Sequence, residues 1–374
     1  MKPLKLISVL VVGALGLGVG VGVGVGSARA SAVAGETPPA IPAASNSAAN
    51  PALPVEGRFP ALSGATTWLN GPALTPSGLH GKVVLVDFWT FSCINSLRPL
   101  PYLRAWAAKY QAQELVVIGV QSPEFAFEQR LDNVRDALAS HAISFPVAVD
   151  NGHRIWNAFQ NEYWPAIYLI DAEGRIRYHR FGEGDYDQTE RAIQALLVEA
   201  GASGVEQNLV SVHGTGAEAA PDWDNVKSPE TYLGYARTER FASPGGAVQD
   251  TRHTYTAPTP LDLNDWALSG EWTMGAEATT VRKAHGRLLF RFHARDLHLV
   301  AGPSTHGSTL HFRVLIDGKP PGSSHGADTD EQGNGTIDGQ RLYQLIRQKA
   351  PIDDRTFEFE FLDPGVDVFA FTFG

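Results

Sequence analysis

The segment from Val83 to Phe88 is apolar at every position except Asp87. An uninterrupted apolar run of this length is typical of a strand buried on both faces, as in an α/β sheet covered by helices. Two further runs, Leu115–Val120 and Ala166–Ile170, have the same character. Helical patterns over residues 97–110, 132–138 and 187–197 alternate with these runs, so the first half of the chain predicts an α/β domain.

The chain changes character after about residue 201. Residues 204–227 form a polar, Gly/Ala-rich linker, and beyond residue 228 short runs of alternating polar and apolar residues are separated by Gly, Pro and Asp. Alternation with a period of two is typical of strands with one buried face, and many such strands in succession predict an antiparallel β-sandwich. We therefore predict an α/β domain over residues 57–203 and an all-β sandwich of jelly-roll type over residues 228–374.

Residues 1–30 have the composition of an export signal. A short basic start is followed by the uncharged stretch Leu6–Gly26 and by the small-x-small sequence Ala28-Arg29-Ala30. A cleaved signal peptide and a retained N-terminal anchor are both compatible with this segment, because the uncharged stretch is long enough to cross a bilayer. In either case we expect a periplasmic or extracellular protein, with residues 31–56 as a flexible Ala/Pro/Ser-rich linker.

The charge balance and the cysteine content exclude several functions. The 374 residues include 40 Asp and Glu against 30 Lys and Arg, a net charge of −10, which argues against nucleic-acid binding. Cys93 is the sole cysteine, which excludes internal disulfides, iron–sulfur clusters and Cys-based zinc sites. We expect no metal and no cofactor. The segment Asp328–Gly339 fits a calcium loop at only some positions, and a polar hairpin tip is the simpler interpretation.

Cys93 follows directly on the first predicted strand and stands where the next helix begins. A helix start offers unpaired N–H groups and a partial positive charge, both of which favour a thiolate. We therefore predict an exposed Cys93 with a lowered pKa that acts as a nucleophile. The alternative for a free cysteine is an inert, buried side chain.

The residues around Cys93 resemble the active-site segment of thioredoxins. The sequence of Val86–Ser96 is similar to that segment, and Tyr163–Ala166 resembles the loop whose cis-proline faces the thiol. Together with Pro123–Glu128 and Ser228–Ala236, the chain is similar to the extracytoplasmic part of DipZ-type thiol–disulfide interchange proteins. The resemblance covers most of the chain. It implies a thioredoxin-like domain followed by a β-sandwich that resembles carbohydrate-binding modules.

The resemblance also assigns roles to single residues. Cys93 is the attacking thiol, and Ser96 stands where the family carries its second cysteine. Asp87 matches the buried acid that serves this second thiol, and Glu124 matches a glutamate near the thiols of related reductases. The resemblance also implies that the substrate docks at three further residues: Trp89, Trp164 and the cis-proline Pro165.

A single thiol changes the chemistry that the resemblance implies. Ser96 cannot attack a mixed disulfide, so an external thiol must resolve it. The expected partners are protein or low-molecular-weight disulfides and thiols, with a membrane-bound electron donor and a glycan on the sandwich left open. Two alternatives stay open as well. The Thr90-x-x-Cys93 pattern resembles peroxiredoxins and favours a thiol peroxidase, whereas a degenerate site favours a non-catalytic binding protein.

Overall fold

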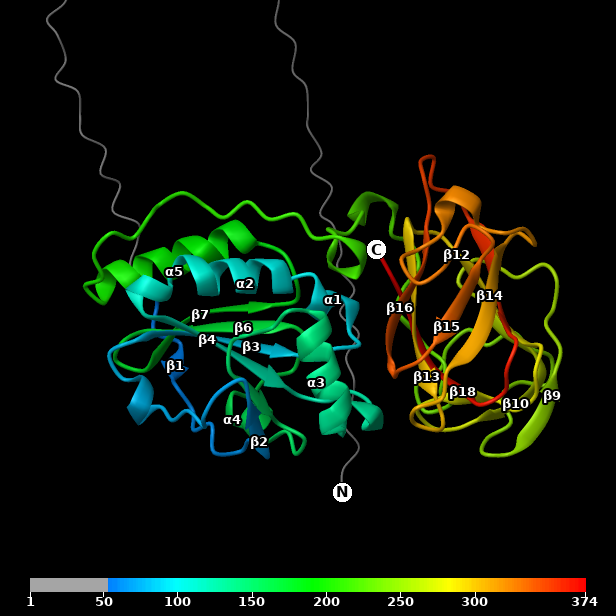
Figure 1. The fold of residues 1–374 in the computed structure, drawn as a ribbon, viewed down its shortest axis with the longest axis horizontal. Helices are drawn as coiled ribbons and strands as arrows, with labels where there is room; N and C mark the ends of the chain where they lie inside the picture. Colours follow the sequence, from blue (N-terminus) through cyan, green and yellow to red (C-terminus); the bar gives the residue numbers. More distant parts are fainter. Residues whose placement is uncertain (1–52) are drawn as a thin grey trace, which may run out of the picture. The chain divides into compact units, whose positions relative to one another are not determined.

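The first predicted strand is β3 (Val83–Trp89), which lies in the middle of a seven-stranded sheet in the computed structural model of the chain (Figure 1). The structure describes residues 53–374, so the predicted export signal and most of the linker after it lie outside the described residues. The strand order is β1-β7-β6-β3-β4-β5-β2, and only the β3–β4 and β4–β5 pairs are parallel. The other strands are β1 (Gly57–Arg58), β2 (Thr67–Leu69), β4 (Leu115–Gln121), β5 (Val147–Val149), β6 (Ala166–Ile170) and β7 (Arg175–Phe181).

Helices cover both faces of this sheet, as the buried strands require. The helices are α1 (Ile94–Leu97), α2 (Leu100–Lys109), α3 (Leu131–Ser140), α4 (Arg154–Ala158) and α5 (Tyr186–Glu199). Apolar side chains of α2, α3 and α5 form one cluster with Leu85 and Trp89 of β3. Val84, Val86 and Phe88 point to the opposite face and pack with α4. A mixed α/β sheet of thioredoxin-like type is therefore confirmed.

The helix predicted over residues 97–110 is interrupted. The chain forms the short α1 first, and α2 begins anew after Pro99. Proline lacks a backbone N–H and fits the first turn of a helix, so Pro99 and Pro101 favour a new start rather than a continuous helix. The break leaves Cys93 and Ser96 on a separate helical turn.

Residues 228–374 form an all-antiparallel sheet that curls on itself, which confirms the predicted all-β class. Its main strand order is β15-β14-β17-β12-β10-β11-β18-β13-β16, with β8 beside β18 and β9 beside β10. The bounds are β8 (Thr231–Tyr232), β9 (Arg252–Tyr255), β10 (Trp266–Met274), β11 (Thr279–Val281), β12 (Gly286–Phe292), β13 (Asp296–Pro303), β14 (Leu310–Ile316), β15 (Asn334–Ile337), β16 (Arg341–Arg347), β17 (Arg355–Phe361) and β18 (Val366–Phe373).

Strand β10 is the place where this sheet turns. Its first half pairs with β12 and its second half with β9 and β11. Gly270 stands between the halves with φ of +96°, and a Cβ there would lie 3.1 Å from the Cα of Gly286. Glycine is the residue that fits such a bend. Trp266 and Trp272, which flank the bend, are both fully buried in the core.

The α/β domain and the all-β domain share an apolar cluster. Val300, Leu342 and Phe369 of the second domain belong to the same buried cluster as the helices of the first. The Phe369 ring lies 4.7 Å from Phe127 and 5.3 Å from Phe125, measured between ring centroids. Both domains belong to one compact unit. The boundaries at residues 203 and 228 stay a prediction, and this shared cluster argues against two independent cores.

The last residues of the predicted N-terminal linker are held on the sheet. The backbone N–H of Glu56 donates to the carbonyl of Ile176 at 2.8 Å, and Arg177 donates to the carbonyl of Leu53 at 2.7 Å. Leu53 and Glu56 therefore contact the sheet, and the linker boundary at residue 56 stays a prediction. No helix in the described part of the chain is long and apolar enough to span a membrane.

Candidate active site

Cys93 lies where β3 gives way to the first helix. It is the N-cap residue of α1, and its carbonyl accepts hydrogen bonds from the N–H groups of Ser96 and Leu97 at 3.0 and 3.2 Å. Its side chain is half-buried. The predicted position at a strand-to-helix junction is confirmed, although α1 is only four residues long.

Ser96 lies within one turn of Cys93 and is completely buried. Its hydroxyl oxygen accepts a hydrogen bond from the N–H of Thr90 at 3.4 Å. Hydrogen bonds from the backbone and the hydroxyl of Ser96 also favour the thiolate of Cys93. The structure therefore brings together the two residues that the Cys-x-x-Ser pattern predicts to be neighbours.

The surroundings of Cys93 raise the pKa of its thiol, which corrects the lowered pKa predicted from the helix start. Burial of the thiol is the largest cause, and the carboxylates of Glu230 and Glu124 add to it because a thiolate would face negative charge. The hydrogen bonds from Ser96 act in the opposite direction and are outweighed. A helix as short as α1 has few aligned peptide dipoles to set against these effects. The predicted exposure of the side chain is also reduced to partial burial.

We therefore expect the alkylation rate of Cys93 to rise without a plateau from pH 7 to about pH 9.5. A free thiol has a pKa of about 8.5, and a thiol with a higher pKa supplies little thiolate below that pH. The measurement is the rate of modification by iodoacetamide, followed by mass spectrometry across this range. A plateau below about pH 8 would show a lowered pKa and contradict this description of the site.

The carboxylate of Glu124 is held by residues of the C-terminal domain. Its Oε1 accepts a hydrogen bond from the Tyr232 hydroxyl at 2.7 Å. The same oxygen forms an ion pair with Nη1 of Arg237 at 2.8 Å. The same Tyr232 hydroxyl lies 3.1 Å from Oε2 of Glu230. Sequence reasoning placed Glu124 near the thiol but missed Glu230, Tyr232 and Arg237. The available signal was that Glu230 and Tyr232 lie within the segment Ser228–Ala236, which carries part of the resemblance.

Glu128 is a second buried acid that sequence reasoning missed. Its Oε1 accepts a hydrogen bond of 2.6 Å from the hydroxyl of Ser92, the residue before Cys93. Its Oε2 accepts from the N–H groups of Glu124 and Phe125 at 2.5 and 3.0 Å. Burial raises the pKa of Glu128, and these donors oppose the shift. Glu128 thus ties the cysteine loop to the loop of Glu124.

Asp87 occupies the interior position expected for it. The residue is 1% exposed, and within the described residues neither of its carboxylate oxygens has a hydrogen-bond partner. Burial raises the pKa of Asp87 from 3.8 to about 8. Strand alternation places its side chain on the same face as Leu85 and Trp89, which is the face covered by α2. Because its pKa is about 8, the carboxyl group of Asp87 is mostly protonated at neutral pH.

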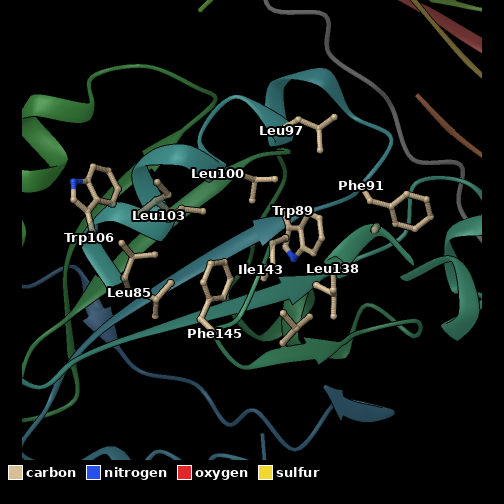
Figure 2. Packing of buried hydrophobic residues seen from close by; sticks show 14 of the residues in the cluster. Leu85, Trp89, Phe91, Leu97, Leu100, Leu103, Trp106, Leu138, Ile143 and Phe145 are labelled. Atoms are coloured by element: carbon tan, nitrogen blue, oxygen red, sulfur yellow. The ribbon is translucent and has the colours of Figure 1, made fainter. Parts of the chain in front are cut away.

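The expected docking residues differ in accessibility. The Trp164–Pro165 bond is cis as predicted, and Trp164 is half-buried, with its indole N–H donating to the carbonyl of Ser122 at 3.0 Å. Trp89 is completely buried, and Figure 2 shows its indole among other core side chains. This corrects the docking role expected for Trp89, because its side chain packs in the interior above Gly119. Tyr163 and Phe181 are exposed instead, with ring centroids 5.0 Å apart.

One group of acids in the described residues has the spacing of metal ligands: Asp171, Glu173 and Glu199. Their carboxylates are already paired with arginines. Arg177 lies 2.9 Å from Asp171 and 2.6 Å from Glu199, and Arg175 lies 2.7 Å from Glu173. The two guanidinium groups offset most of the charge of these three acids, which form an ion-pair network with them.

Comparison with known proteins gives the following matches. The family model described as the AhpC/TSA family matches residues 59–179, and the one described as the thioredoxin like C-terminal domain matches residues 228–374. The DipZ proteins of Mycobacterium bovis and Mycobacterium tuberculosis are 35% identical over 324 residues, which cover 85% of this chain and 43% of DipZ. The chain therefore spans less than half the length of these relatives.

Shorter proteins match the first domain alone. The thiol-disulfide oxidoreductase YkuV of Bacillus subtilis is 31% identical over 141 residues, which cover 38% of this chain and 95% of YkuV. The solution structure of a thioredoxin-like protein in its oxidized form is 32% identical, with a TM-score of 0.36. That match covers 38% of this chain and 96% of the solved one.

Proposed function

Because the chain belongs to the family of thioredoxin-like thiol–disulfide oxidoreductases, we propose that it exchanges disulfides through the single thiol of Cys93. The observation that carries this proposal is the pairing of Cys93 with Ser96 on one helical turn. Cys93 is the sole cysteine of the chain, and Ser96 lies where a second thiol would have to lie to resolve an adduct.

The reaction begins when Cys93 loses its proton to solvent. The Sγ thiolate attacks one sulfur of a substrate disulfide, so that a new S–S bond forms as the substrate's bond breaks. The departing sulfur leaves as a thiolate and takes a proton from solvent. A hydroxyl group at Ser96 cannot repeat this step. An external thiolate must therefore attack the mixed disulfide, either a small thiol or a membrane-bound donor.

Exposure to a disulfide is expected to leave a long-lived covalent adduct on the wild-type protein. The experiment treats the protein with hydroxyethyl disulfide at about pH 9, where more of the Cys93 thiol is ionised. Non-reducing mass spectrometry then detects the mass increase. The control is Cys93→Ser, which should stay unmodified. Failure of the wild-type protein to form any adduct would overturn the proposal and favour a non-catalytic binding protein.

Thiol peroxidase is a second candidate, favoured by the Thr90-x-x-Cys93 pattern and by the AhpC/TSA match. A peroxidase needs a thiolate and a cation that polarises the peroxide. Both reactions start from the thiolate, so the raised pKa of Cys93 does not separate them. The cation Arg237, however, is already paired with Glu124. We therefore rank disulfide exchange first. Peroxide consumption that depends on Cys93 would reverse this order.

We further propose an exported protein whose second domain serves as a binding module of the β-sandwich type. The export proposal rests on the composition of residues 1–30. The carbohydrate-module resemblance supports a glycan ligand, but Trp266 and Trp272 are buried and cannot stack on a sugar. These two tryptophans therefore do not support a glycan site on this domain.

A further inference from the structure

The C-terminal domain contributes side chains to the surroundings of the Cys93 thiol. Tyr232 lies on β8, which pairs with the last strand of that domain, β18. Its hydroxyl bridges two carboxylates, at 2.7 Å from Glu124 of the first domain and 3.1 Å from Glu230 of the second. Glu128 accepts hydrogen bonds from the hydroxyl of Ser92, the residue before Cys93, and from the N–H of Glu124, so the Glu124 loop is tied to the cysteine loop. The two domains therefore meet at the group that carries the proposed chemistry.

Arg237 completes this contact. Its guanidinium group pairs with Glu124 at 2.8 Å and lies 3.6 Å over the Tyr232 ring and 5.3 Å over the Phe125 ring. The Glu124 side chain is only 9% exposed, so its charge depends on these two partners for compensation. Removing either partner would free the Glu124 carboxylate to move.

We propose that Tyr232 and Arg237 are positioning residues that hold Glu124, and that together with Glu230 they let the C-terminal domain control the reactivity of Cys93. This inference rests on the proposed function, because it assigns a regulator to the same thiol. The charged and titratable groups at the thiol are Glu124 and Glu230, with Tyr232, Arg237 and the buried Glu128 around Glu124. Two negative charges facing one cation disfavour a thiolate. A partner that displaces the segment of residues 230–237 would activate the thiol.

The test is the pH profile of Cys93 alkylation by iodoacetamide in the full chain. Glu230→Gln removes one facing charge and keeps the shape of the side chain, so we expect alkylation at a fixed pH near 8 to become roughly three- to tenfold faster. Tyr232→Phe removes the hydroxyl whose hydrogen bond lowers the pKa of Glu230, so less negative charge faces the thiol and alkylation should again become faster. Glu230 is exposed, so the variant should fold normally.

Matched controls come from the same segment. Tyr235→Phe removes a hydroxyl that bonds Asp250 at 2.9 Å, and Glu239→Gln removes an exposed charge; both should keep the wild-type profile. A charge effect predicts one further result. The rate ratio of anionic iodoacetate to neutral iodoacetamide should rise several-fold in Glu230→Gln. A merely structural role would leave this ratio unchanged.

Unchanged profiles in both Glu230→Gln and Tyr232→Phe, with thermal unfolding like that of the wild type, would overturn the inference. This outcome is distinct from failure of the proposed function, because alkylation does not require disulfide exchange. A protein that forms no mixed disulfide yet shows the shifted profile would refute the proposed function alone.

Discussion

Replacing Asp87 by asparagine is expected to stabilise the protein by several kcal/mol above about pH 8. The carboxyl group has a pKa of about 8 when folded against 3.8 as its ordinary value. Between these values the unfolded chain is ionised while the folded protein keeps its proton, so the folded state binds more protons and stability falls as the pH rises. The difference between a pKa of 3.8 in the unfolded chain and about 8 in the folded protein sets an upper limit of about 5 kcal/mol on the penalty. Asparagine keeps the shape of the side chain and has no charge to desolvate.

The measurement is urea unfolding of both proteins at about pH 5, 7 and 9. The advantage of Asp87→Asn should be small at the lowest pH and should grow up to about pH 8, above which it stays constant because both states are then ionised. Asp136→Asn, an exposed position on α3, is the control and should have an effect within about 0.5 kcal/mol at each pH. An equal advantage at pH 5 and pH 9 would show that the Asp87 carboxyl group has no raised pKa.

The central strands of the first domain could be predicted because β3 and β6 are buried at every position and β4 at every position but one. The predicted strand Val83–Phe88 is β3, which extends one residue further to Trp89, and the predicted strand Ala166–Ile170 has the same bounds as β6. The helix after β3 was predicted too long, because apolar spacing continues across Pro99 while the backbone does not. Apolar periodicity records which face is buried, and it carries less information on where a helix begins.

The part of the site that the C-terminal domain contributes could not be predicted from local sequence patterns. Glu124 and Tyr232 lie 108 positions apart, and Glu124 and Arg237 lie 113 apart. Only the contact between the domains brings these side chains together. The same contact explains the wrong pKa prediction for Cys93. The helix start was visible in the sequence, whereas burial of the thiol and the charge of Glu230 arise only in the folded chain.

Restoring a second thiol by Ser96→Cys is expected to shorten the lifetime of the Cys93 adduct at least about tenfold, because attack within the protein replaces attack by an external thiol. Ser96 is buried on the same helical turn as Cys93, and residues three apart in a helix have Cα atoms close enough for a disulfide. The pKa of Asp87 is about 8, so its carboxylate is ionised and able to accept a proton only from about pH 8 upward, and the experiment is therefore run at about pH 9. Turnover of a protein disulfide with added dithiol should rise by a similar factor.

The measurement follows the adduct by non-reducing mass spectrometry after the excess disulfide is removed. Asn95→Cys is the matched control. It adds a thiol one residue earlier, and side chains two apart in a helix do not face each other, so its adduct should persist as in the wild type. In the double variant Asp87→Asn with Ser96→Cys, resolution should slow again because the proton acceptor is lost. Equal adduct lifetimes in the wild type and Ser96→Cys would mean that position 96 does not reach the mixed disulfide. Ser96 would then not occupy the position of a resolving thiol.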